Sequence, residues 1–240
     1  AASDVYKRQN PQLSLANPGT VNLITGSSSA SYKFVLTNPY NLQITWSSTI
    51  NSGEPWTTST FLGVSGSAGL ASQGRFNYPS GILYDGAGNL YYADSFNNAI
   101  CTVPAINPTT ITVVAGSTTA ASGSTDGTGT SALFSYPFGI AYDGSATLYV
   151  TDRTNNTIRK IVISTKVVTT IAGTAGISGS ADGTGSAARF NSPCGIAYYS
   201  GSLYIADAKN NTIRKLVLST NAVTTIAGTA GVTGSSDGTG

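Results

Sequence analysis

A phrase of more than fifty residues recurs along the chain, and it limits the possible folds more than any other feature. Phe76, Phe134 and Phe190 lie 58 and 56 residues apart, and they open the similar stretches FNYPSGILYD, FSYPFGIAYD and FNSPCGIAYY. Each repeat closes with ITVVAG or VTTIAG, followed by a loop that carries DGTG. A period of several tens of residues indicates an array of similar structural units rather than one irregular core.

Each repeat contains four short β-prone runs. In the repeat over residues 134–189, turn-forming residues separate the runs GIAYD, TLYVTD, TIRKIVIS and VVTTIAG. We therefore predict one four-stranded antiparallel meander per repeat. A single meander cannot bury both of its faces, so neighbouring meanders must pack face to face, and radial packing of this kind yields a β-propeller.

The composition agrees with an all-β fold and excludes several kinds of site. The 240 residues include 28 Gly and 13 Tyr, as expected for short strands joined by tight turns. Because the chain contains no His, a Ser-His-Asp triad, a histidine base and a histidine-ligated zinc are impossible within it. No apolar run is long enough to span a membrane as a helix.

Charged side chains are sparse and nearly balanced, with 12 Lys and Arg against 10 Asp and Glu. The pairs Arg159-Lys160 and Arg214-Lys215 each lie on one predicted strand, where alternation sends the two side chains to opposite faces. Nucleic-acid binding depends on clustered cations, so we expect no nucleic-acid partner.

The most specific strings are Asp-x-x-Asn-Asn-Thr-Ile-Arg-Lys at 152–160 and 207–215, each preceded by Pro-x-Gly-Ile-Ala-Tyr. These strings resemble the core of the NHL repeat, and the resemblance covers residues 76–240. It implies a propeller that usually closes with about six blades. The first repeat departs from the pattern at Ala99, Cys101 and Thr102, where Thr, Arg and Lys are expected, so we interpret it as a variant blade.

The repeats divide the chain into segments. We expect blades over residues 76–133, 134–189 and 190–240, with the chain cut inside the linker after the last one. Residues 11–75 are predicted to form a divergent blade in which SYKFVL and NLQITW pair, but a β-hairpin linker or the end of an immunoglobulin-like domain also fits residues 11–60. Residues 1–10 fit no part of the pattern and are expected to be non-native. The predicted fold is an incomplete arc of about four blades from a six-bladed propeller.

Residues repeated in every unit are expected to maintain the blade. Chain direction alternates in a meander, so the turn after the second strand and the linker after the fourth lie on one rim. Asp94, Asp152 and Asp207 end the second strand, and we expect each carboxylate to bond the backbone of the next turn. The same repeated motif includes Asn98, Asn156, Asn211, Arg159 and Arg214. The NHL resemblance implies that its arginines make a structural contact between blades.

Metal and thiol chemistry are not expected. Asp126, Asp182 and Asp237 lie in Gly-rich loops, but each loop offers one carboxylate, whereas calcium takes about six to eight oxygen ligands. We predict Asp-Gly turns there, without a metal or other cofactor. Cys101 and Cys194 occupy unmatched positions in non-adjacent repeats, so we expect both to be unpaired and partly buried.

Positions that differ between repeats but share the rim are better candidates for ligand binding. They are Ser95-Phe96, Arg153-Thr154 and Ala208-Lys209. Variation within a fixed frame is how repeat proteins place a binding surface. We predict Phe96, Arg153 and Lys209 as contact residues.

The sequence favours a non-catalytic binding or scaffold module that binds a protein or a glycan through this rim. We expect it to act outside the cytoplasm, on a secreted or surface-anchored bacterial protein. The resemblance also implies an alternative, a fragment of a gluconolactonase-like or strictosidine-synthase-like six-bladed hydrolase or lyase, whose site would lie largely in other blades. A purely structural spacer is the third hypothesis.

Overall fold

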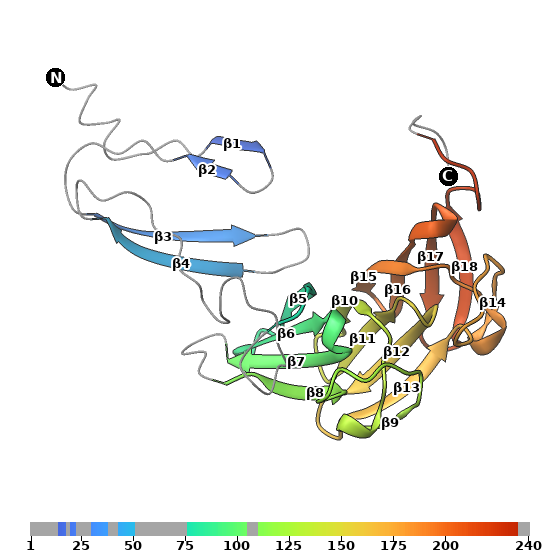
Figure 1. Ribbon diagram of the computed structural model, residues 1–240. Coiled ribbons are helices and arrows are strands. Elements are labelled where there is room, and N and C mark those ends of the chain that lie inside the picture. The colour runs from blue at the N-terminus through green and yellow to red at the C-terminus, as the bar shows by residue number, and fades with distance from the viewer. Residues whose placement is uncertain are drawn as a thin grey trace. The chain divides into compact units, whose positions relative to one another are not determined.

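The computed structural model describes residues 76–104 and 110–234, together with four strands nearer the N-terminus (Figure 1). Residues 1–59 and 60–240 form two compact units. In the first unit, β1 (Ser14–Asn17) pairs with β2 (Thr20–Asn22), and β3 (Ala30–Thr37) pairs with β4 (Gln43–Ile50). The pairing of β3 with β4 confirms the strand pair predicted from SYKFVL and NLQITW. Most of the predicted divergent blade over residues 11–75, and all of residues 1–10, lie outside the described residues.

Three antiparallel meanders lie in the second unit, one in each repeat (Figure 1). The first blade contains β5 (Pro79–Tyr84), β6 (Asn89–Asp94), β7 (Ala99–Pro104) and β8 (Thr112–Gly116). The second contains β10 (Pro137–Tyr142), β11 (Thr147–Asp152), β12 (Thr157–Val162) and β13 (Val167–Ala172). The third contains β15 (Pro193–Tyr199), β16 (Ser202–Asp207), β17 (Thr212–Val217) and β18 (Ala222–Ala227). The all-β fold with four-stranded antiparallel blades is therefore confirmed.

A short piece of each linker adds a fifth strand to the next blade. The strand β9 (Gly127–Thr128) pairs with β13, and β14 (Gly183–Thr184) pairs with β18. Both pieces belong to the DGTG loops, which the sequence predicted as turns only. Each linker thus reaches the outer edge of the following blade before it enters that blade's first strand.

The helical segments of the described residues are single 3-10 turns. They are η2 (Ser95–Asn97), η3 (Gly129–Ser131), η4 (Gly185–Ala187) and η5 (Ala208–Asn210). No helix in the part of the chain that the structure describes is long and apolar enough to cross a membrane.

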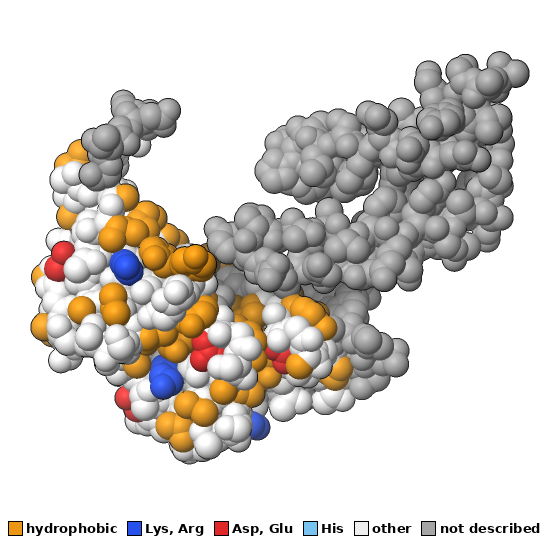
Figure 2. All heavy atoms as spheres, turned by 180° about the vertical axis from the view of Figure 1, so that it is seen from behind, with side chains coloured by type: hydrophobic (Ala, Val, Ile, Leu, Met, Phe, Trp, Pro, Cys, Tyr) orange, Lys and Arg blue, Asp and Glu red, His pale blue; other side chains and the backbone are white. Residues whose placement is uncertain are grey.

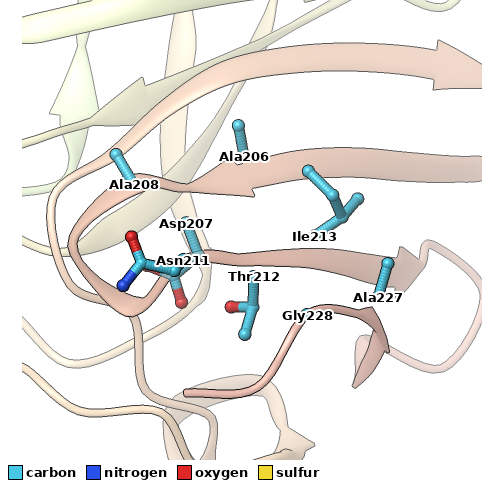
Figure 3. Close-up of a pocket in the computed structure, with 8 residues that line it drawn as sticks. All are labelled: Ala206, Asp207, Ala208, Asn211, Thr212, Ile213, Ala227 and Gly228. Carbon is cyan, nitrogen blue, oxygen red and sulfur yellow. The ribbon is translucent and has the colours of Figure 1, made fainter. Parts of the chain in front are cut away.

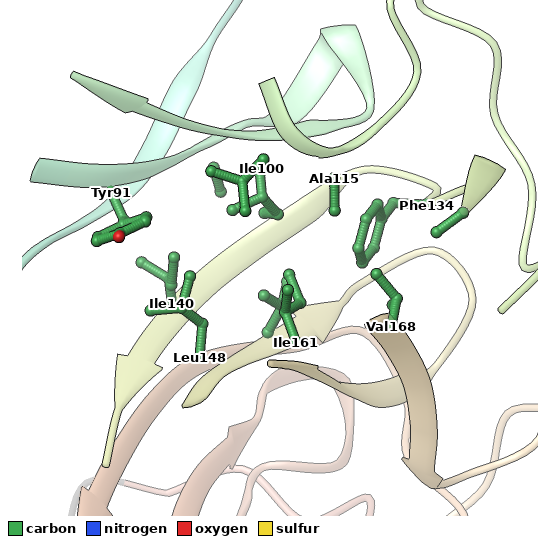
Figure 4. Close-up of a cluster of buried hydrophobic side chains, with 12 residues drawn as sticks. Tyr91, Ile100, Ala115, Phe134, Ile140, Leu148, Ile161 and Val168 are labelled. Atoms are coloured by element: carbon green, nitrogen blue, oxygen red, sulfur yellow. The ribbon is translucent and has the colours of Figure 1, made fainter. Parts of the chain in front are cut away.

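Two of the buried hydrophobic clusters in the described residues lie between consecutive blades, and a third lies within the first blade. One buried cluster joins Ala115 of the first blade to Phe134 of the second (Figure 4), and another joins Ala172 of the second blade to Phe190. Both phenylalanine side chains are fully buried. Burial of such a side chain contributes roughly 1.5–3 kcal/mol. The phenylalanine of each of these repeats therefore seals the apolar face of the preceding blade.

The first strands of neighbouring blades approach each other where each carries a glycine. A Cβ atom at Gly81 would lie 2.5 Å from the carbonyl oxygen of Phe138, and one at Gly139 would overlap the carbonyl oxygen of Cys194. Gly195 has only the Cβ of Ala206 nearby, at 3.6 Å. The glycine of Pro-x-Gly is thus required by close backbone contact at the two blade junctions, and not by its own backbone conformation.

Candidate functional site

The second and third blades each hold a buried arginine between two carboxylates. In the second blade, Nη1 of Arg159 lies 2.7 Å from Oδ2 of Asp152, and Nη2 lies 2.8 Å from Oδ1 of Asp126. The guanidinium also donates to the carbonyl oxygen of Leu133 at 2.9 Å and lies 4.9 Å above the ring of Phe134. The arginine thereby fastens the incoming linker to the third strand of the blade.

The third blade repeats this arrangement. Nη1 and Nη2 of Arg214 lie 2.9 Å from the carboxylates of Asp207 and Asp182, and its guanidinium lies over the ring of Phe190 at 5.2 Å. Burial alone would raise the pKa of Asp182, but hydrogen bonds from Thr225 and Arg214 outweigh it and lower that pKa. The carboxylates of the first two DGTG loops, Asp126 and Asp182, are thus committed to the arginine network.

The carboxylates at the ends of the second strands have partners that the sequence did not predict. Asp152 accepts hydrogen bonds from the backbone N–H of Ser135 and from the side chain of Asn155, both at 2.8 Å, instead of from the backbone of the following turn. The turn closes its own hydrogen bond, from the N–H of Asn156 to the carbonyl of Arg153. The predicted Asx-type arrangement is wrong, because the backbone N–H that Asp152 accepts comes from Ser135 in the linker, and its contact with the turn is to the side chain of Asn155.

The second asparagine of the turn joins consecutive blades at the two described junctions. Asn98, Asn156 and Asn211 all adopt the left-handed conformation, with φ of 53°, 58° and 58°. The Oδ1 atom of Asn98 accepts the N–H of Tyr136 at 2.8 Å, and that of Asn156 accepts the N–H of Ser192 at 2.8 Å. Each of these two asparagines therefore fixes the residue that precedes the first proline of the next blade.

The first blade lacks the arginine because Cys101 takes its place. Burial raises the pKa of Asp94, although hydrogen bonds from Asn77 and Asn97 partly oppose this. Burial also raises the pKa of the Cys101 thiol. Both cysteines are free, as predicted, but Cys101 is fully buried and only Cys194 is partly exposed. In residues 76–104 and 110–234, no three His, Cys, Asp or Glu side chains gather as metal ligands would.

Four aromatic rings and one arginine gather on the rim that carries the turns after the second strands. We call this group the aromatic platform, and its members are Tyr78, Phe96, Tyr136, Phe138 and Arg153. Ring centroids lie 5.2 Å apart for Tyr78 and Phe96, 5.2 Å for Phe96 and Tyr136, and 6.2 Å for Tyr136 and Phe138. The guanidinium of Arg153 lies 5.3 Å and 5.2 Å from the centroids of Tyr136 and Phe138.

The backbone holds part of this platform in an unusual conformation. Tyr78 and Tyr136 have φ of 56° and 57°, a region that bulky residues rarely adopt. The equivalent Ser192 of the third repeat has φ of 53°, so the packing of the repeats imposes this conformation at all three positions. The side chains of Tyr78 and Phe96 remain 56% and 51% exposed. The platform therefore offers rigidly placed rings to solvent.

The platform contains two of the three predicted contact residues. Phe96 and Arg153 belong to it, whereas Lys209 is exposed on the third blade and is not a member. The sequence analysis missed Tyr78, Tyr136 and Phe138. The sequence does contain a signal for the two tyrosines. The residue before the first proline differs between repeats, as the rim turns do: it is Tyr in the first two repeats and Ser in the third.

A pocket lies on the third blade (Figure 3). At the equivalent positions of the first and second blades, the phenylalanine of the next repeat packs. The lining residues of the pocket are Ala206, Asp207, Ala208, Asn211, Thr212, Ile213, Ala227 and Gly228. The glycines that correspond to Gly228 are Gly116 and Gly173, and the rings of Phe134 and Phe190 lie against them. We therefore call this pocket the phenylalanine socket and do not assign it a small-molecule ligand.

No family model matches the chain. Among curated proteins, it is 32% identical over 158 residues to NHL repeat-containing protein 2 of Bos taurus, across 62% of this chain and 22% of the bovine protein. It is 37% identical over 97 residues to protein SUPPRESSOR OF QUENCHING 1, chloroplastic, of Arabidopsis thaliana, across 40% of this chain and 9% of the plant protein. The chain thus spans less than a quarter of the length of these relatives.

Solved structures share the fold. A protein of unknown function from Bacteroides thetaiotaomicron superposes with a TM-score of 0.56 at 28% identity, over 76% of this chain and 43% of that one. An auxiliary nutrient binding protein from Bacteroides ovatus superposes with a TM-score of 0.51 at 23% identity, over 61% of this chain and 37% of that one. The second likeness concerns the fold alone.

Proposed function

The chain carries NHL-type repeats folded as β-propeller blades, and from this premise we propose that it is a non-catalytic binding module whose aromatic platform binds a protein partner. The observation that carries the proposal is the exposure of Tyr78 and Phe96 beside Arg153 on one rim. Tyrosine and arginine are among the residues that contribute most of the binding energy in protein interfaces. Contiguous exposed apolar groups on a protein surface commonly mark interaction sites.

The charge distribution supports the platform as the main contact surface. Acidic and basic side chains are few on the face shown in Figure 2. Among the described residues, all ion pairs belong to Arg159 and Arg214, so Arg153 has no carboxylate partner. A guanidinium that lies over aromatic rings still has N–H donors that can bind an acceptor on a partner.

The described carboxylates do not support a catalytic role for these blades. Each of them accepts hydrogen bonds from backbone, Asn, Ser, Thr or Arg groups: Asp85, Asp94, Asp126, Asp143, Asp152, Asp182 and Asp207. General acid-base catalysis requires a carboxylate that can exchange a proton with a substrate. The location outside the cytoplasm stays a prediction.

We expect the platform variants Tyr78→Ala and Phe96→Ala to weaken partner binding by about tenfold or more, because each removes an exposed ring of the platform. The probes are a displayed library of random peptides and a glycan array, both selected first on the unchanged chain. Tyr199→Ala is the matched control, since Tyr199 is 72% exposed and lies outside the platform. Affinities are then measured by titration calorimetry.

Selected peptides that bind the Tyr199 variant normally and the platform variants weakly would support the proposal. Glycans selected in place of peptides, with the same dependence on the platform, would overturn the protein partner and keep the site. Equal affinities for all variants would overturn the site itself.

A further inference from the structure

The buried arginines of the second and third blades show which groups surround an arginine that lies on an aromatic ring in this chain. The guanidinium of Arg159 lies 4.9 Å from the centroid of the Phe134 ring, and that of Arg214 lies 5.2 Å from the centroid of the Phe190 ring. Each guanidinium also contacts two carboxylates, at distances between 2.7 and 2.9 Å. The ring therefore holds the plane of the guanidinium, and carboxylates accept from its N–H donors.

Arg153 of the aromatic platform has similar ring contacts without a carboxylate. Its guanidinium lies 5.3 Å and 5.2 Å from the ring centroids of Tyr136 and Phe138. Within the part of the chain that the structure describes, every ion pair belongs to the two buried arginines. A carboxylate supplied by another molecule would give Arg153 the surroundings that the two buried arginines have.

The exposed charges on the turns after the second strands are positive. Arg153 is partly exposed, and Lys209 is exposed on the equivalent turn of the third blade. The carboxylates that end the second strands, Asp94, Asp152 and Asp207, are fully buried. An acidic segment that lies on these turns therefore meets no exposed carboxylate from them, and its charge is complementary to theirs.

The platform suits a carboxylate better than a phosphate. A phosphate group carries about 1.5–2 negative charges at neutral pH and is usually bound by a cluster of arginines. The platform has a single cation, Arg153. Burial and the neighbouring phenol of Tyr78 raise the pKa of Tyr136, although Arg153 partly opposes this, so the Tyr136 phenol stays neutral. The exposed rings of Tyr78 and Phe96 offer apolar surface beside this cation.

We propose that the aromatic platform recognises an acidic peptide segment, in which an Asp or Glu carboxylate binds Arg153 and a neighbouring apolar side chain packs on Tyr78 and Phe96. The proposal rests on the proposed function and specifies the chemistry of the partner. A guanidinium offers paired N–H donors that match the two oxygens of a carboxylate. Because the rings hold the guanidinium before the partner binds, less conformational freedom is lost on binding.

The test is a double-mutant cycle between Arg153 and the acidic residue of peptides selected on the unchanged chain. Replacement of that residue by its amide, and Arg153→Gln in the chain, are each expected to weaken binding by about tenfold. The two changes together should weaken it about as much as either alone, because they remove the same interaction. Lys166→Gln is the control and should bind normally, since Lys166 is exposed in the turn after β12, on the opposite rim.

Titration calorimetry measures each affinity, and the outcomes separate this proposal from the proposed function. Peptides that require Tyr78 and Phe96 but have no acidic residue, or that lose equal affinity for the unchanged chain and for Arg153→Gln on amide replacement, would overturn the acidic partner and keep the platform. Tighter binding of a phosphoserine version would overturn the carboxylate. Peptides that need neither ring would overturn both proposals. The amide peptides test the unchanged chain, so the result does not depend on how Arg153→Gln folds.

Discussion

Replacement of Arg159 by Met is expected to lower the free energy of unfolding by about 3–5 kcal/mol. The change removes the only cation that contacts the buried carboxylate of Asp152, as far as the described residues show. It also leaves the carbonyl oxygen of Leu133 without the donor that ties the linker to the blade. Chemical denaturation followed by circular dichroism measures the loss.

Lys160→Met is the matched control for this substitution. Lys160 is the next residue of β12 and is partly exposed, whereas Arg159 is fully buried. The control is expected to change stability by no more than about 0.5 kcal/mol. The buried network is refuted as a stabilising element if both variants unfold at the same denaturant concentration.

The pH dependence of the Arg159 variant gives a second check on the cause. Burial raises the pKa of Asp152 from 3.8 to about 6, against the lowering effects of Asn155 and Arg159. The pKa of Asp152 in the folded state lies above its unfolded value, so the folded state holds the proton more tightly. The free energy of unfolding therefore falls as the pH rises from the unfolded pKa to the folded pKa. Without Arg159 the folded pKa of Asp152 rises further. The difference in free energy of unfolding between the variant and the unchanged protein should therefore become smaller in acid. Addition of Asp152→Asn should recover part of the loss at neutral pH.

Replacement of Gly139 by Ala is expected to lower the free energy of unfolding by about 1–3 kcal/mol or more. The new methyl group would overlap the carbonyl oxygen of Cys194 and lie 3.1 Å from Oγ1 of Thr151. A backbone oxygen cannot rotate away as a side chain can, so the first strands of the two blades must separate. Thermal unfolding at matched protein concentration measures the effect.

Gly195→Ala separates the steric cause from the general effect of adding a methyl group to a strand. Gly195 is the corresponding glycine of the third blade, and its new Cβ atom would contact only the side chain of Ala206, at 3.6 Å. Its effect is expected to be neutral or stabilising by about 0.4–1 kcal/mol. Equal losses at the two glycines would show that the first strands do not pack as described.

The repeat was enough to predict most strands, because each blade's hydrophobic pattern is local. The run TLYVTD coincides with β11 (Thr147–Asp152). The fifth strands were missed, since β9 and β14 are Gly-Thr pairs in Gly-rich loops and carry no β signal of their own. Their pairing depends on an edge strand that lies about forty residues further along the chain.

The aromatic platform was predicted only in part for a related reason. Phe96 and Arg153 occupy turns that the repeat alignment places on the rim. The backbone of Tyr136 is set by Asn98 of the preceding blade, a contact across 38 residues. No local pattern predicts a left-handed tyrosine, because local sterics disfavour it and only the packed blades impose it. The partners of Asp152 were missed for the same reason, as Ser135 lies 17 residues before it.

The central claim is that consecutive repeats share one core, and amide hydrogen exchange of a Phe190→Leu variant tests it most directly. Phe190 belongs to the third repeat but packs in a cluster with Ile158 and Ala172 of the second. The smaller side chain should lower the opening free energy by about 1 kcal/mol in both sheets, with faster exchange in β12 and β13 as well as in β16 and β17. Faster exchange in the third blade alone would contradict the claim.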